Sequence, residues 1–393
     1  MNFTINRKEL LESFNQFIRK KYFIVFLFNF LLRLIIKIPI YVVASIVYEK
    51  NFSMLDSFAA IAMTWYVGLP LREAKQFVFM PLLIQIFSLN FIICPYLTWL
   101  MIDLTGYSVG FAVVFHLMDK RMEEWNIKKS ENFLELYIVS NLLFPVSYLK
   151  WNQTFGLLLM LVSLTVYFIF EEKLHFSLIF AILSALTHLY GWVLVSILII
   201  YTYKDRRYFQ YIIPTFVVLL QFFFFYIRTG DFLLYFHGQQ AYKRKKSISY
   251  PFNWMIFYSD YLTTNLYLAT LYISVLWSIL IVVLYLYYYI RNDHIDKLNL
   301  VILLYFIFVH MMFGTKPSAI NRYSVLILPF CAILILIKFM NGVDTRKLWI
   351  LIAILFVVNI LLIWYLILAD FLNVSDIGVI YEKASNYIKT KIG

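Results

Sequence analysis

The sequence has few of the charged residues that soluble domains carry on their surfaces. Charged residues make up 14% of its 393 residues, while 63% are hydrophobic and 20% are aromatic. Ordinary globular chains carry about 25% charged residues. No segment is long and polar enough to fold outside a bilayer, which excludes a soluble enzyme on a single membrane anchor. We therefore expect most of the chain to lie in hydrocarbon.

Cysteine, glycine and proline are also scarce. The two cysteines, Cys94 and Cys331, both lie in apolar runs, which excludes a disulfide framework and a cysteine metal site. Eleven glycines and nine prolines exclude collagen and low-complexity linkers. The sequence also has no HExxH motif, no glycine-rich phosphate loop and no internal repeat. We expect no metal, no cofactor and no nucleic-acid partner.

Long apolar runs are what the sequence does contain. A membrane-spanning helix needs roughly 20 apolar residues. The run 174–202 is too long for one untilted span, and its interruption at Thr187-His188 predicts two short helices that meet near one membrane face. With that division we expect an all-α integral membrane protein of about eleven transmembrane helices, in one domain spanning residues 1–393. The runs are 23–48, 93–118, 133–149, 154–170, 174–202, 208–226, 257–290, 298–313, 320–340 and 348–368.

Basic residues predict the orientation of these spans. The head, residues 1–22, is rich in Lys and Arg and precedes the first run, which indicates a cytoplasmic N-terminus. Alternation then leaves three notable segments outside: the first outer loop 49–76, the outer loop 227–256 and the tail 370–393. The membrane is expected to be the plasma membrane of a prokaryote or archaeon, or the endoplasmic reticulum of a eukaryote. The outer loop 227–256 is unusually basic, with Arg228, Lys243, Arg244, Lys245 and Lys246.

The first outer loop has the pattern of an interfacial helix headed by Asp56. Phe58, Ile61, Ala62 and Trp65 fall at helical spacing, so the segment is expected to lie along the membrane surface. Asp56 has two interpretations, an N-cap for this helix or a general base beside a lipid-borne substrate. On the residue alone the N-cap is the commoner case. The next segment, 77–85, is expected to be a second short interfacial helix.

Short segments of the first outer loop, called boxes below, resemble the first-loop signature of the GT-C glycosyltransferases, and most closely the PIG-V-like mannosyltransferases. Weaker matches follow in order along the rest of the chain. That signature is roughly Trp-Asp-Ser/Ala-x-x-Tyr-x-x-Ile-Ala, then Gly-Tyr and a Phe-x-Pro-Leu-x-Pro box. The sequence departs from it at Leu55, where tryptophan is usual, and at His188, where the family often has arginine. The matching segments are Leu55-Asp-Ser-Phe-Ala-Ala-Ile-Ala62, Tyr66-Val-Gly68, Phe79-Met-Pro-Leu82, Phe144-Pro-Val-Ser147, Trp151-Asn-Gln-Thr154, Leu186-Thr-His-Leu-Tyr-Gly191, Ser249-Tyr-Pro-Phe252 and Asn321-Arg-Tyr323.

The resemblance implies a GT-C-like fold and a transferase on the extracytoplasmic face. It would move a hexose, mannose by analogy, from a polyprenyl- or dolichyl-phosphate donor to a lipid-linked or glycan acceptor, with Asp56 as catalytic base. Arg322 and the basic cluster Lys243, Arg244, Lys245 and Lys246 would hold the donor phosphate. The expected substrate-binding residues are His188, Trp151, Asn152 and Tyr250.

The same residues have simpler interpretations. Arg322 can extend its charged head to the interface, and the basic cluster can bind anionic lipid headgroups. His188 alone is more often an interhelical histidine than a ligand. A transporter or flippase of lipid-linked sugars, and a non-catalytic scaffold subunit, are therefore alternative functions. A transporter of this kind is expected to show two related halves with interrupted spans, which the sequence lacks.

Three ionisable residues lie inside apolar runs. Arg33 and Lys37 are four residues apart and share a helix face in the first span, and Asp103 lies near the middle of the second. Charges at membrane depth are costly and pair or face a cavity. The sequence predicts that Asp103 faces at least one of the two cations.

Overall fold

The computed structural model describes most of the apolar part of the chain. Single residues and pairs, among them Ile61, Ala62 and Trp65, are described between the longer segments. The longer described segments are 20–47, 77–90, 95–122, 130–144, 155–202, 210–240, 266–289, 296–311, 326–340 and 342–371.

All regular secondary structure in these segments is helical, and strands are absent from them. Four helical stretches are long and apolar enough to cross a membrane: Leu97–Arg121, Gln210–Thr229, Leu268–Tyr288 and Thr345–Tyr365. The described part is thus that of an α-helical membrane protein. The helices are α2 (Lys21–Val47), α5 (Phe79–Phe87), α6 (Pro95–Arg121), α7 (Phe133–Leu142), α8 (Phe155–Phe170), α9 (Leu174–Thr187), α10 (Leu189–Thr202), α11 (Ile213–Thr229), α12 (Leu234–Gln240), α15 (Leu266–Tyr289), α16 (Asp296–Met311), α18 (Leu328–Met340) and α19 (Thr345–Phe371).

The helix boundaries follow the apolar runs closely, except in a few cases. Helix α7 ends at Leu142, well short of the predicted run 133–149. Helices α7, α8, α9 and α18 are each shorter than the roughly 20 residues that a simple span requires. The total of eleven spans therefore stays a prediction. The short α5 occurs where the second interfacial helix is expected.

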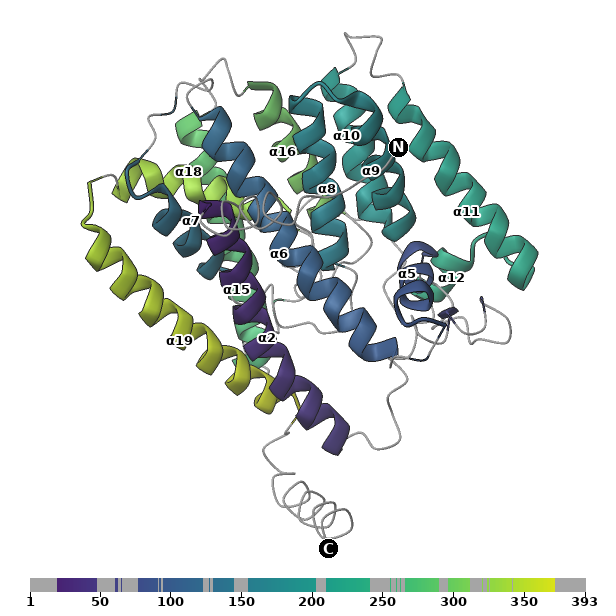
Figure 1. Cartoon of the computed structure of the whole chain (residues 1–393), viewed down its shortest axis with the longest axis horizontal. Coiled ribbons are helices and arrows are strands. Elements are labelled where there is room, and N and C mark those ends of the chain that lie inside the picture. Colours follow the sequence, from purple (N-terminus) through teal and green to yellow (C-terminus); the bar gives the residue numbers. More distant parts are fainter. Residues whose placement is uncertain are drawn as a thin grey trace, which may run out of the picture.

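Helix α6 packs against both α2 and α8 (Figure 1). It packs antiparallel to α2, because Tyr22 contacts His116 while Lys37 contacts Asp103. It runs parallel to α8, because Gly156 at the start of α8 lies beside Asp103 and Glu171 just after α8 lies beside Lys120.

Glycines allow α6 and α8 to approach very closely. A Cβ atom at Gly106 would lie 2.5 Å from the backbone carbon of Gly156, and one at Gly156 would lie 1.9 Å from the carbonyl oxygen of Asp103. Gly110, one turn further along α6, is crowded by Leu159 in the same way. Small residues four apart are typical of tight helix pairs in membranes, where close backbone contact replaces the hydrophobic driving force.

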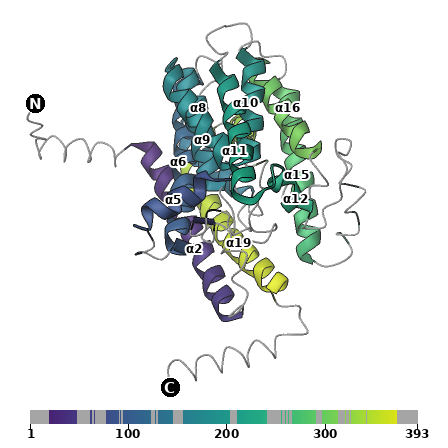
Figure 2. The same cartoon turned by 90° about the vertical axis from the view of Figure 1, so that its right-hand side faces the viewer.

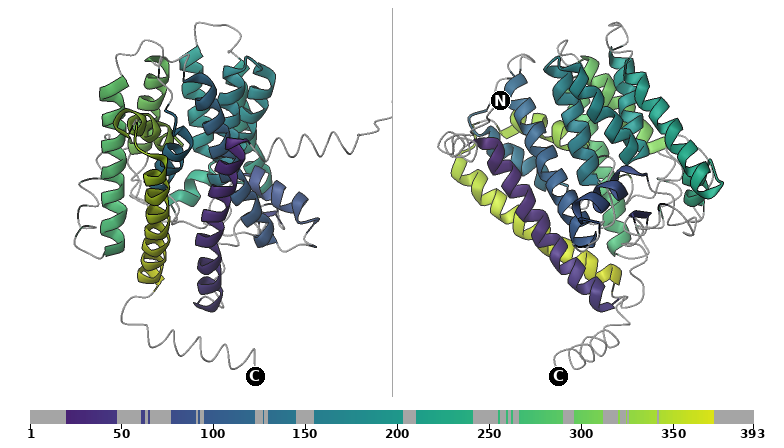
Figure 3. Two further views of the ribbon diagram at one scale, coloured as in Figure 1. Left: turned by 60° about the vertical axis from the view of Figure 1, so that its left-hand side comes forward. Right: turned by 45° about the vertical axis from the view of Figure 1, so that its right-hand side comes forward.

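Helices α19, α15 and α16 lie further from this pair. Helix α19 runs beside α2 (Figure 3), with the rings of Phe28 and Phe356 5.9 Å apart. Asn359 of α19 donates to the carbonyl oxygen of Leu142 at 3.0 Å and so joins α19 to the end of α7. Helices α15 and α16 lie on the side of the molecule away from α2 (Figure 2).

Connections that are predicted to be cytoplasmic contact one another in two places among the described residues. Lys120, after which α6 ends, pairs with Glu171 between α8 and α9 at 2.6 Å. Asn132, just before α7, donates to the carbonyl oxygen of Val343 at 2.6 Å. These contacts agree with the predicted alternation of loops. They do not involve the membrane itself, so which end faces the cytoplasm stays a prediction.

Candidate functional site

The predicted interruption at Thr187-His188 is present as a sharp break between two helices. Helix α9 ends at Thr187, and His188 has extended backbone angles of φ −162° and ψ 148°. Helix α10 starts at the next residue and packs closely on α9, since a Cβ at Gly191 would lie 2.3 Å from the carbonyl oxygen of Ser184. The two helices form a hairpin with His188 at its tip.

The His188 ring is held by its neighbours at this tip. The backbone N–H of Tyr190 donates to Nδ1 at 3.2 Å, so the proton of the neutral ring is carried by Nε2. The ring lies 5.8 Å from that of Phe155 and 5.5 Å from that of Tyr190. His188 is half-buried. A half-buried, oriented imidazole can offer a hydrogen-bond donor to a ligand.

The contact between Phe155 and His188 joins the residue that follows one sequence box to a residue of another. Phe155 directly follows the box Trp151-Asn-Gln-Thr154, and His188 lies in the box Leu186–Gly191. The start of α8 and the α9–α10 tip therefore lie at one level. That level is also the level of Asp103, through its contact with Gly156. The part of α6 from Pro95 to Asp103 extends past this level by about 12 Å.

Asp103 joins three helices at the same level. Its Oδ2 forms an ion pair with Lys37 of α2, and its Oδ1 accepts the backbone N–H of Gly156 at 2.8 Å. This N–H is among the first of α8 and has no partner within that helix. The carboxylate thus caps α8 from another helix and lies at the positive end of its dipole. The structure contains the pairing that the sequence predicts for Asp103.

Arg33, the other predicted cation, lies one turn away on the same face of α2. Its guanidinium carbon is 3.4 Å from the ring centroid of Tyr107 and 5.5 Å from that of Phe111. The residue is 2% exposed. Stacking on aromatic faces suits a delocalised guanidinium. The α2–α6 interface therefore holds two cations and one carboxylate next to the start of α8.

Two described residues of the first outer loop pack against this region. Ile61 belongs to a buried cluster that also contains Ala185 and Leu189, which flank the His188 break. Ala62 belongs to a cluster with Leu157 and Leu161 of α8. The segment five and six residues after Asp56 is thus anchored to the start of α8 and to the α9–α10 tip.

The first outer loop also contacts the start of the basic outer loop. Arg228, in the last turn of α11, donates from Nε to the carbonyl oxygen of Trp65 at 2.9 Å. The ring of Trp65 lies 6.4 Å from that of Phe224 on the same helix. Trp65 of the first outer loop therefore lies beside the end of α11, where the basic outer loop begins.

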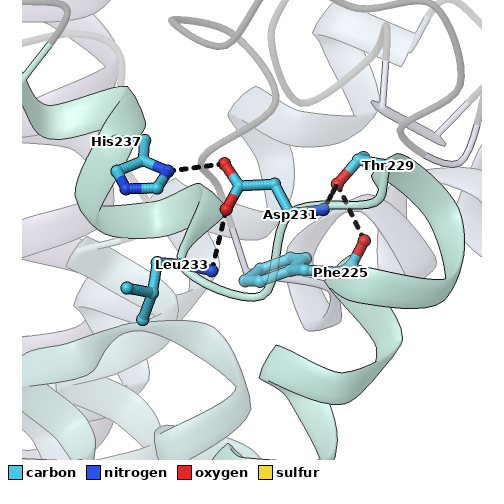
Figure 4. A network of polar contacts seen from close by, with 5 residues as sticks. All are labelled: Phe225, Thr229, Asp231, Leu233 and His237. Atoms are coloured by element: carbon cyan, nitrogen blue, oxygen red, sulfur yellow. Dashed lines mark hydrogen bonds and ion pairs between the residues drawn. The ribbon is translucent and has the colours of Figure 1, made fainter.

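An aspartate–histidine pair that the sequence alone did not predict lies directly after α11 (Figure 4). Gly230 ends that helix with a left-handed φ of 75°, and the chain turns at Asp231 into α12. His237 Nδ1 lies 2.8 Å from Asp231 Oδ2, and Asp231 Oδ1 accepts the backbone N–H of Leu233 at 2.9 Å. The imidazole is 45% exposed. The signal in the sequence was an aspartate directly after Gly230, with a histidine six residues further along.

The other predicted site residues lie outside the described residues. They are the expected base Asp56, the phosphate-binding residues Arg322, Lys243, Arg244, Lys245 and Lys246, and the substrate-binding residues Trp151, Asn152 and Tyr250. Their roles stay predictions. The described residues include no group of three or more His, Cys, Asp or Glu that could hold a metal ion.

Comparisons with family models, with curated proteins and with solved structures find no match to this chain.

Proposed function

We propose that the protein is a membrane glycosyltransferase of the GT-C type. It would transfer a hexose, mannose by analogy, from a polyprenyl- or dolichyl-phosphate donor to the hydroxyl of a lipid-linked or glycan acceptor on the extracytoplasmic face. The observation that carries the proposal is the meeting of residues from two of the sequence boxes with the helix that follows a third. Ile61 of the first box clusters with Leu189 of the box at the His188 tip, and Ala62 clusters with Leu157 of α8. Phe155, which directly follows the box Trp151–Thr154, contacts His188.

The proposed chemistry is a single displacement at the anomeric carbon. The acceptor oxygen forms a bond to that carbon while the bond to the phosphate oxygen of the donor breaks, which inverts the configuration. Asp56 accepts the proton of the acceptor hydroxyl. The leaving group is a lipid monophosphate, and Arg322 with the cluster 243–246 would balance the charge that grows on it.

Described residues next to this site would hold its helices in place. The Asp103 carboxylate holds the start of α8 through Gly156, and Phe155 there packs on the His188 ring. With Nδ1 accepting from Tyr190, the neutral His188 ring carries its proton on Nε2, and this N–H would donate to a sugar hydroxyl when the substrate binds. His188 and the preceding box Trp151–Thr154 would contribute to substrate binding.

The direct test is transfer of a radiolabelled sugar by the purified full-length protein. Dolichyl-phosphate mannose and dolichyl-phosphate glucose serve as donors, with total lipid extract as the acceptor source. Asp56→Asn is expected to lower turnover at least a hundredfold, the lower bound for a lost general base. His188→Ala is expected to raise the substrate KM more than it lowers kcat.

Asp344→Asn is the matched control, because it removes a carboxylate near the opposite end of the helices, where Asp344 caps α19 by accepting the N–H of Arg346 at 2.7 Å. It is expected to retain activity. Full activity in Asp56→Asn would refute the proposed mechanism. Flipping of the labelled lipid across proteoliposomes without sugar transfer would favour the transporter alternative.

A further inference from the structure

An open groove lies between α2, α6 and α8, in the half of these helices away from the His188 tip. Its volume is about 500 Å³, within the roughly 300–1,000 Å³ typical of ligand pockets. Val109, Ala112 and Val113 of α6 line it together with Phe23 and Phe26 of α2 and Leu164 of α8. The side chains on α6 are short, which leaves the space between the larger side chains of α2 and α8 unfilled.

The groove is apolar along its length and polar at one end. The ring of His116 lies 5.6 Å from that of Tyr22 and 5.8 Å from that of Tyr167. Lys20 Nζ lies 5.6 Å from the centre of the Tyr22 ring. All four residues line the groove. One ammonium, one imidazole and two phenol groups thus gather where α2 begins and α6 approaches its end.

The charge at this end favours an external anion. Glu171 pairs with Lys120 at 2.6 Å and with Arg121 at 3.6 Å, so these neighbouring cations have a carboxylate partner. Lys20 is exposed, and no ion pair involves it within the part of the chain that the structure describes. A lysine above an apolar groove extends its charge to the membrane surface. It is positioned to meet the phosphate of a lipid.

We propose that this groove binds an anionic glycerophospholipid of the surrounding bilayer. One acyl chain would lie against Val109, Ala112 and Val113, and the phosphate would lie at Lys20 and the His116–Tyr22–Tyr167 group. Basic pockets between transmembrane helices are typical sites for anionic headgroups. A free phosphate would leave the apolar length of the groove empty, and in a zwitterionic lipid the choline cation would offset the attraction between Lys20 and the phosphate. The site lies away from the candidate active site and does not depend on the proposed transferase activity.

The test compares two lipids that share their acyl chains and differ in headgroup charge. Purified full-length protein in a neutral detergent is titrated with dioleoylphosphatidylglycerol or dioleoylphosphatidylcholine, and the bound fraction is measured by native mass spectrometry. The wild type is expected to bind phosphatidylglycerol more tightly. Lys20→Gln is expected to weaken that binding about fivefold, the effect of one lysine near an anionic surface, and to weaken phosphatidylcholine binding less, because the choline cation offsets the attraction of the phosphate to Lys20.

Two further variants locate the site. Ala112→Leu fills the groove and is expected to weaken binding of both lipids. Lys347→Gln removes an exposed cation at the start of α19 that does not line the groove, and is expected to bind like the wild type. Equal binding of the two lipids by the wild type would overturn the proposal. So would an equal loss in Lys20→Gln and Lys347→Gln, or tighter binding of undecaprenyl phosphate than of phosphatidylglycerol at the same site.

Discussion

Neutralising Asp103 should destabilise the protein strongly, because its carboxylate serves two partners inside the membrane region. The Asp103 side chain is 1% exposed and that of Lys37 is 4% exposed. Asp103→Asn keeps the shape of the side chain but leaves the Lys37 ammonium buried next to a neutral amide. It also weakens the cap on Gly156, since a neutral oxygen accepts a weaker hydrogen bond than a carboxylate.

The size of the effect follows from the burial of the pair. Removing one partner of a buried ion pair costs about 3–5 kcal/mol. An unfolding entropy of about 2.1 cal/mol/K per residue amounts to about 0.8 kcal/mol/K for a chain of 393 residues. Dividing the first quantity by the second gives an expected fall in Tm of about 4–6 °C.

The chain provides its own probe for this measurement. Cys331 is 0% exposed, so a thiol-reactive fluorogenic dye reaches it when the protein unfolds. Because the chain has two cysteines, a Cys94→Ser background makes Cys331 the sole reporter. Thermal unfolding of each variant is then followed in detergent by the rise in dye fluorescence.

A double variant separates the ion pair from other effects of the substitution. Lys37→Met with Asp103→Asn removes both charges, and is expected to recover most of the lost stability because no uncompensated charge from the pair remains buried. Lys347→Met is the control for replacing an exposed lysine and is expected to leave Tm within 1 °C or so of the wild type, about the effect of a neutral surface change. The reasoning is refuted if Asp103→Asn matches this control, or if the double variant loses the sum of the two single losses.

Three further predictions use the same unfolding assay. Gly156→Ala should lower the free energy of unfolding by about 1–3 kcal/mol, since its Cβ would lie 1.9 Å from the carbonyl oxygen of Asp103; an unchanged Tm would contradict the close α6–α8 contact. Gln221→Leu should raise Tm, because both amide atoms of Gln221 are buried in α11 with no hydrogen-bond partner among the residues that the structure describes; a fall would show that the amide has a role in the folded protein. Glu171→Gln should lower Tm slightly at pH 7, because the hydrogen bond from Lys120 holds the pKa of Glu171 below its usual 4.5. A lowered carboxyl pKa adds stability above pH 4.5, and this stability is lost as the pH falls through the lowered pKa of the folded protein. The difference in Tm between wild type and Glu171→Gln should therefore vanish in acid, and a difference that persists there would contradict the reasoning.

Several features of the fold are visible in the sequence because a bilayer imposes strict rules. Apolar runs must be helical where no water can satisfy the backbone, so most helix boundaries follow the runs. A polar Thr187-His188 step inside a long run predicts the break that separates α9 from α10. Charges inside such runs must find partners, which predicts the pairing of Asp103 with a cation on α2.

The sequence could not identify contacts that depend on how the helices pack. The second acceptor oxygen of Asp103 binds the N–H of Gly156, and nothing in a glycine 53 residues away indicates that contact. The pair Asp231–His237 requires the turn that Gly230 makes after α11. The early end of α7 at Leu142 is likewise invisible in an apolar run that continues beyond it.

By itself, then, the sequence determined that this protein is a helical membrane protein, where its helices break, and which buried charges need partners. These properties follow from the order of apolar and charged residues along the chain and do not require knowing how the helices pack. The tertiary structure alone decided that the start of α8, the His188 tip and the residues Ile61 and Ala62 meet, and that α2, α6 and α8 leave a groove between them. It also decided the close approach of α6 and α8 at Gly106 and Gly156, since how near two helices come depends on both surfaces at once.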